Sequence, residues 1–157
     1  KGIRSVTRDL RPVALDDLGL LASLRALGRD FSGDGGVAVR FKAMGGSPRL
    51  SAEGEAAVYR AMQEALSNAL RHGARERVDV ALEVAADGVT LTVTDDGPGF
   101  PDDAAGRLRS RGGLAGIRER VASLGGDFSM ENADDGGARI RVRLPETPRT
   151  EGAEVVQ

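Results

Sequence analysis

The chain has 157 residues, of which 40% are hydrophobic and 29% charged, and its formal net charge is −2. These values predict one soluble globular domain with its own core, and the small negative charge gives no reason to expect nucleic acid or an anionic membrane as the main partner. The absence of cysteine excludes disulfides and thiolate metal sites, and no apolar run reaches the roughly 18 residues that a membrane-spanning helix needs.

The first segments of the chain are predicted to be helical. Residues 1–10 place apolar side chains at helical spacing, and Pro12 ends this pattern because proline disfavours the α region for the residue before it. A second helix is predicted from about Asp16, which can cap it. Its apolar stripe consists of Leu20, Leu24, Leu27 and Phe31. A turn follows at 32–36, and the alternation of residues 37–41 predicts a strand.

Two further helices are predicted in the rest of the chain. The longer one runs from about Ser51 to Arg71, with Gly73 as its C-cap. Its buried face is expected to consist of Val58, Met62, Ala65, Leu66 and Ala69. The shorter one is stopped by two glycines, Gly125 and Gly126. Its residues with helical apolar spacing are Leu114, Ile117, Val121 and Leu124.

Period-2 alternation predicts strands in the second half of the chain, at 78–84, 89–95 and 138–144, with another strand around 128–131. The tail from 147 to 157 is polar and without period, and is predicted to be disordered. Strands that follow one another, with helices to one side, predict an α+β fold. We expect a two-layer sandwich in which a mixed, mostly antiparallel sheet is covered on one face by helices.

Three stretches hold residues suited to binding chemistry. On the long helix, Glu64, Asn68 and His72 are four residues apart and share one side, which is either a solvated face or one wall of a site. TDDGPGF (94–100) places a carboxylate and glycines at the end of a strand, and RGGLAGIRER (111–120) places glycines before a helix N-terminus, where an anion is stabilised. Each of the two glycine stretches alone also fits an ordinary turn or loop, and the spacing matches neither a P-loop nor a Rossmann motif.

Together, an E-x-x-x-N helix, a D-x-G-x-G after a strand and a glycine-rich entry into a helix resemble the Bergerat-fold ATPases. This superfamily contains DNA gyrase, the ninety-kilodalton heat-shock chaperone, mismatch-repair ATPases and sensor histidine kinases. DLRPVALDDLGLLASLRAL (9–27), NALRHG (68–73) and GGLAGIRERV (112–121) resemble the histidine kinases that partner NarL-type response regulators. The resemblance implies that residues 1–13 are the end of a dimerisation helix and a linker, and that residues 14–146 are an ATP-binding catalytic domain.

The resemblance also implies roles for individual residues. Asn68 would ligate Mg²⁺ through its amide oxygen, with triphosphate and water completing the coordination. Asp95 would accept a hydrogen bond from the adenine amino group, which predicts ATP over GTP because guanine presents a carbonyl oxygen at that position. Glycines would shape the backbone around the base and the phosphates, namely Gly97, Gly99, Gly113 and Gly116.

Several other polar residues keep two interpretations each. His72 would lie near the phosphates or cap the helix end, and Arg71 would contact phosphate or face solvent. Glu64 corresponds to the acid that polarises the attacking water in gyrase-like relatives, and orienting a Mg²⁺-bound water is equally compatible with its position. Guanidinium groups in the predicted ATP lid, about residues 100–112, either clamp the triphosphate or are solvated. These lid residues are Arg107, Arg109 and Arg111.

The single histidine of the chain, His72, lies in the nucleotide helix. The resemblance implies a phosphoacceptor histidine on a dimerisation helix outside this chain. We therefore expect a cytoplasmic, monomeric part of a longer homodimeric kinase, which binds Mg·ATP but does not autophosphorylate alone. Two alternatives stay open: an anti-sigma-factor-type serine kinase, and a non-catalytic nucleotide-sensing interaction module.

Overall fold

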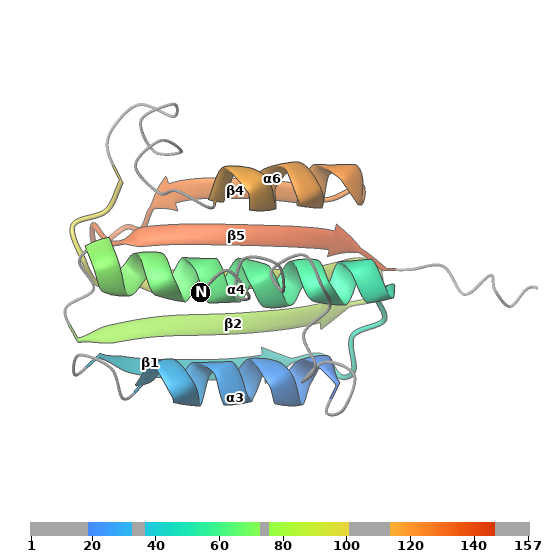
Figure 1. Cartoon of the computed structure of the whole chain (residues 1–157), viewed down its shortest axis with the longest axis horizontal. Helices are drawn as coiled ribbons and strands as arrows, with labels where there is room; N and C mark the ends of the chain where they lie inside the picture. The colour runs from blue at the N-terminus through green and yellow to red at the C-terminus, as the bar shows by residue number, and fades with distance from the viewer. Residues whose placement is uncertain (1–18, 33–36, 73–75, 101–113, 147–157) are drawn as a thin grey trace, which may run out of the picture.

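The computed structural model describes residues 19–32, 37–72, 76–100 and 114–146. Both predicted end segments, 1–13 and 147–157, lie outside these residues. The helices and strands in chain order are α3 (Leu20–Ser32), β1 (Ala38–Met44), α4 (Ala52–His72), β2 (Arg77–Ala85), β3 (Gly88–Asp95), α6 (Leu114–Ser123), β4 (Asp127–Asn132) and β5 (Ala138–Pro145) (Figure 1).

The strands form one five-stranded sheet in the order β1-β2-β3-β5-β4. β1 and β2 are parallel, because the chain crosses back through α4 between them, whereas the other three neighbouring pairs are antiparallel. The β2–β3 hairpin closes with Ala85 opposite Gly88. A mixed, mostly antiparallel sheet was predicted from the sequence, and the structure confirms it.

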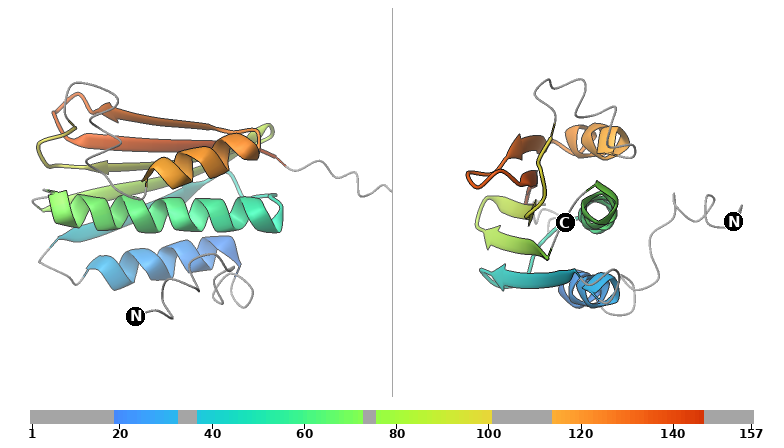
Figure 2. Two further views of the ribbon diagram at one scale, coloured as in Figure 1. Left: turned by 45° about the horizontal axis from the view of Figure 1, so that its top comes forward. Right: turned by 90° about the vertical axis from the view of Figure 1, so that its left-hand side faces the viewer.

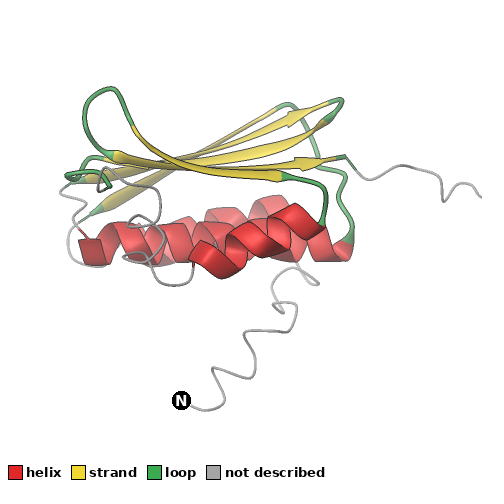
Figure 3. Ribbon diagram, turned by 90° about the horizontal axis from the view of Figure 1, so that it is seen from above, coloured by secondary structure: helices red, strands yellow, loops and turns green. Residues whose placement is uncertain are grey.

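All three helices lie against the same face of the sheet, which gives the molecule two layers (Figures 2 and 3). The core fills the space between the layers, because alternate strand residues such as Val78, Val80 and Leu82 are buried toward the helices. The predicted buried face of α4 is confirmed, since each of its five members is at most 5% exposed. Within the described ranges, no helix is both long enough and apolar enough to cross a membrane.

The ends of two elements differ from the prediction. α3 begins at Leu20 and not near Asp16, because Gly19 has a φ of 84°, which no α-helix contains. β1 continues past residue 41 to Met44, because its pairing with β2 extends to Glu83. The predicted stop of α6 is confirmed: the amides of Gly125 and Gly126 bond back to Ala122 and Val121, as in a Schellman motif.

Candidate functional site

One hollow opens between the C-terminal half of α4 and the neighbouring strands β3 and β5. It is a small hollow that is partly open to solvent. The residues that line it are Ala65, Asn68, Ala69, Val93, Asp95, Phe100, Ala138 and Ile140. The two polar side chains in this set, Asn68 and Asp95, are the two that the sequence motifs singled out for binding. Helix α4 and the end of strand β3 therefore bring both groups to a single cavity.

Asp95 is the last residue of β3, and one of its carboxylate oxygens is held by the backbone. Oδ1 accepts hydrogen bonds from the amide of Gly97 at 2.9 Å and from the amide of Ala138 at 3.2 Å. The second oxygen, Oδ2, accepts no hydrogen bond from any described residue. The carboxylate is thus fixed in orientation through one of its oxygens.

The neighbouring carboxylate, Asp96, has a different role that the sequence did not reveal. Its oxygens accept hydrogen bonds from the amides of Glu76 and Arg77, at 3.0 and 3.1 Å for Oδ2. These are the amides at the start of β2, so Asp96 fastens the end of β3 to the beginning of its neighbour. Of the two adjacent acids, only Asp95 lines the hollow.

The glycines of the D-x-G-x-G stretch allow a close approach between two segments of backbone. Gly99 has a φ of 89°, and a Cβ added there would lie 2.5 Å from the carbonyl oxygen of Gly136 and 2.7 Å from Oδ1 of Asn132. A Cβ at Gly137 would overlap the carbonyl oxygen of Asp95. The turn between β4 and β5 therefore packs directly behind the D-x-G-x-G loop. Sequence reasoning missed Asn132 and Gly137, because neither belongs to a motif.

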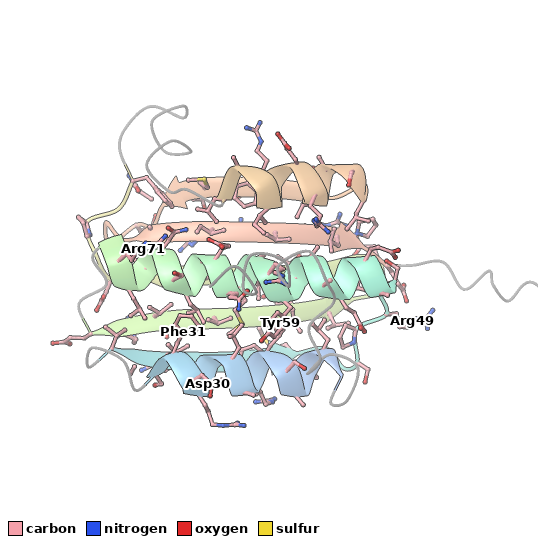
Figure 4. The ribbon with its side chains drawn as sticks, in the orientation of Figure 1. Asp30, Phe31, Arg49, Tyr59 and Arg71 are labelled. Atoms are coloured by element: carbon pink, nitrogen blue, oxygen red, sulfur yellow. The ribbon has the colours of Figure 1, made fainter. Side chains whose placement is uncertain are left out.

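Asn68 is 3% exposed, and its amide oxygen is bonded to a cationic side chain. Arg71 donates from Nη2 to Asn68 Oδ1 at 2.9 Å and from Nη1 to the hydroxyl of Ser67 at 2.8 Å. Arg71 is exposed and lies at the C-terminal end of α4 (Figure 4). The Asn68 amide oxygen is therefore paired with a cationic group, and another cation at this atom would have to displace Arg71.

The other predicted site residues are distributed differently. Glu64 is half-buried one turn before Asn68, forms no ion pair with any described residue, and is not among the residues that line the hollow. Gly116 is exposed on α6 and faces a separate open groove near the start of α4, which Glu53 and Glu119 also line. His72 ends α4, and its side chain lies outside the described part of the chain. So do Gly73, Gly113 and the three lid arginines.

The family model described as histidine kinase-, DNA gyrase B- and HSP90-like ATPase matches residues 53–148. The chain belongs to this ATPase family. The matched span contains all three elements that line the hollow, so the hollow lies in the ATPase domain, and a domain of this family binds ATP.

Curated relatives confirm the resemblance to sensor histidine kinases. The histidine-protein kinase/phosphatase DegS of Brevibacillus brevis is 34% identical over 92% of the chain, and the sensor kinase MctS of Rhizobium johnstonii is 36% identical over 94%. The oxygen sensor kinase NreB of Staphylococcus carnosus is 33% identical over 92% of the chain. The chain spans only 37%, 32% and 42% of these three proteins, respectively.

Solved structures confirm the fold. The ATP-binding domain of PrrB from Mycobacterium tuberculosis is 24% identical with a TM-score of 0.59, covering 81% of this chain and 93% of that one. The Acinetobacter baumannii histidine kinase AdeS has a TM-score of 0.63 at 15% identity, covering 82% of this chain and 64% of that one. The α+β sandwich is therefore the fold of histidine kinase ATP-binding domains.

Proposed function

We propose that this chain is the catalytic domain of a two-component sensor kinase, which binds Mg·ATP and donates the γ-phosphoryl group to a histidine of a dimerisation domain. The observation that supports this most strongly is the hollow shared by Asn68 and Asp95. It offers a carboxylate for a base and a buried amide oxygen for a cation, within reach of one bound nucleotide.

At the base end, Asp95 Oδ2 accepts a hydrogen bond from the adenine amino group. The apolar side chains of Val93, Phe100 and Ile140 would contact the purine ring. Guanine would bring a carbonyl oxygen toward the same carboxylate, and two facing acceptors repel each other. The pocket therefore selects ATP over GTP.

At the phosphate end, Asn68 would hold Mg²⁺ through Oδ1, where the ion would replace the hydrogen bond from Arg71. Amide and phosphate oxygens are hard ligands that suit this ion, which when bound neutralises charge on the triphosphate. No group of three or more His, Cys, Asp or Glu in the described residues offers an alternative metal site. Glu64, one helical turn away, would orient a water beside the ion, and His72 and Gly113 would contribute to the phosphate side.

The acceptor histidine belongs to another domain, because His72 is the only histidine of the chain and lies on the nucleotide helix. Phosphoryl transfer depends mainly on positioning the acceptor against the nucleotide. The chain alone, without that acceptor, therefore has almost no autophosphorylation activity. The phosphoryl group then passes to a NarL-type response regulator. Of the described features, the hollow and its two polar groups favour this function over a degenerate interaction module.

The test has two parts. In calorimetric titrations, the chain should bind Mg·ATP at least about tenfold more tightly than Mg·GTP, the factor expected from exchanging one favourable polar contact for a repulsive one. With labelled ATP, acid-labile label should form on the dimerisation domain of the parent kinase only when both polypeptides are mixed. Stable label on His72, or no binding of Mg·ATP, would contradict the proposal.

A further inference from the structure

The turn between β4 and β5 lies behind the D-x-G-x-G loop and contacts it at several atoms. We propose that Asn132 is a positioning residue: it fixes the backbone of Gly99 and Phe100 and so keeps one wall of the nucleotide pocket in its binding shape. This inference rests on the proposed nucleotide site, and adds to it a residue that lies 32 positions beyond Phe100 and outside every motif of the sequence.

Asn132 pairs with both backbone groups of one residue. Its Oδ1 accepts a hydrogen bond from the amide of Phe100 at 2.7 Å, and its Nδ2 donates to the carbonyl oxygen of Phe100 at 3.5 Å. The first bond is short for an amide donor, and the second is at the limit of hydrogen bonding. Together they fix the position and the direction of the Phe100 backbone against the end of β4.

The residue held in this way forms part of the pocket. Phe100 is 6% exposed and lines the same hollow as Asp95 and Asn68. Gly99 lets Asn132 come this close, because any side chain at Gly99 would meet Oδ1 of Asn132 at 2.7 Å. The hydrogen bonds between Asn132 and Phe100, called the Asn132 clamp below, therefore depend on the glycine at position 99. Of these two residues, only Gly99 belongs to the D-x-G-x-G motif.

The β4–β5 turn also contacts the other side of the pocket. The amide of Ala138 donates a hydrogen bond to Asp95 Oδ1 at 3.2 Å. The turn therefore carries Asn132 at one end and a hydrogen-bond donor to Asp95 at the other. Within the turn, the amide of Ala133 donates to the carbonyl of Gly137 at 2.6 Å. This bonded turn sets the spacing between the carboxylate and the apolar wall, which is the spacing that a purine must match.

Removal of the Asn132 side chain should affect binding more than folding. The residue is exposed at the end of β4, so its loss leaves no cavity in the core. Without the clamp, the Phe100 backbone samples other positions and must be ordered again when a nucleotide binds. The substitution should therefore weaken binding of the base and leave the phosphate contacts unchanged.

The experiment compares wild type with Asn132→Ala, Asn132→Asp and a matched control, Asp134→Ala. Asp134 is an exposed residue of the same turn that has no hydrogen bond or ion pair with described residues. The affinities for Mg·ATP and for adenosine are measured by calorimetry, and exchange of the Phe100 amide hydrogen is followed by NMR. Adenosine lacks phosphates, so it reports on the base end alone.

Asn132→Ala should weaken both ligands by a similar factor of about 3 to 10, the net value of a lost hydrogen bond, and should speed exchange of the Phe100 amide. Asn132→Asp keeps the acceptor for this amide, so its affinities should lie between those of wild type and Asn132→Ala. Asp134→Ala should bind like wild type.

Two outcomes would overturn the inference. One is an Asn132→Ala variant that binds both ligands as wild type does while its Phe100 amide exchanges faster. Another is an Asn132→Asp variant that is as weak as Asn132→Ala. If Asn132→Ala does not fold, Asn132→Ser replaces it with the same expectation, since its shorter side chain cannot span both backbone groups. A wild-type chain that binds no nucleotide would refute the proposed function itself, whereas unchanged binding in the variants refutes only the role of Asn132.

Discussion

The most direct test of the proposed base pocket is the substitution Asp95→Asn. The variant keeps an oxygen that can accept from the amides of Gly97 and Ala138, which now bond to Oδ1 at 2.9 and 3.2 Å. Its new amide nitrogen takes the place of Oδ2 and faces the adenine amino group, so two donors oppose each other. A hydrogen bond to a charged group is worth about 1.5 to 3 kcal/mol, so affinity for Mg·ATP should fall by roughly 10- to 150-fold.

The same substitution should change the preference between nucleotides. The new amide can donate to the carbonyl oxygen of guanine, so Mg·GTP should bind as well as before or better, and the ratio of the two affinities should collapse. Four calorimetric titrations, of two proteins with two nucleotides, measure this ratio directly. A ratio that stays at the wild-type value would refute the assignment of Asp95 to the base.

Asp96→Asn is the matched control because it makes the same change of charge one residue along the chain. Asp96 bonds to the amides of Glu76 and Arg77 and does not line the hollow. Its variant should bind Mg·ATP within about twofold of wild type, since the asparagine keeps an oxygen that can accept from the same two amides and lies outside the lining of the hollow. If Asp95→Asn and Asp96→Asn weaken binding equally, the effect is one of general charge and the hydrogen-bond model is wrong.

Other predictions concern the cation, the backbone and the single tyrosine. ATP affinity should be higher with Mg²⁺ than with a chelator, and Asn68→Ala should abolish most of this difference while leaving adenosine binding intact. If the difference is retained, the ion binds elsewhere. Gly99→Ala should lower the free energy of unfolding in urea by more than Gly136→Ala: both have positive φ, which costs an alanine about 1–2 kcal/mol, but only at Gly99 does the new Cβ collide with other atoms. Equal losses would show that the collision is relieved. Burial raises the pKa of Tyr59 above 10.0, so the folded state holds this proton to higher pH than the unfolded state, and the stability that results is present below 10.0 and lost as pH rises through the folded pKa. Absorbance titration reports Tyr59 alone, since the chain has one tyrosine and no tryptophan, and a midpoint at or below 10.0 would contradict this.

The sequence predicted those features that depend on local pattern. The buried face of α4 follows from apolar residues at helical spacing, and the strands follow from alternation, so both were found. The ends of α3 and β1 were missed for physical reasons. The start of α3 depends on the positive φ of Gly19, and the end of β1 depends on how far β2 runs beside it.

The candidate site was predictable where a motif marks it, and hidden where distant segments meet. Asp95 and Asn68 were found through their motifs, and they line one hollow. Asn132 was missed because its contact with Phe100 exists only once β4 is paired with β5. The roles of Asp95 and Asp96 could not be separated from two adjacent letters, because the difference lies in which amides each carboxylate faces. Gly116, expected beside the phosphates, faces a different groove.

The hollow takes its walls from three places in the chain: the middle of the sequence supplies α4, the next stretch supplies β3, and the final strand β5 supplies Ala138 and Ile140. A growing or partly unfolded polypeptide that lacks β5 also lacks one of the two amides that orient Asp95, that of Ala138. Ligand affinity is consequently a property of the completed domain only, and saturation with nucleotide at 100 times Kd would add about 2.7 kcal/mol to its resistance to unfolding.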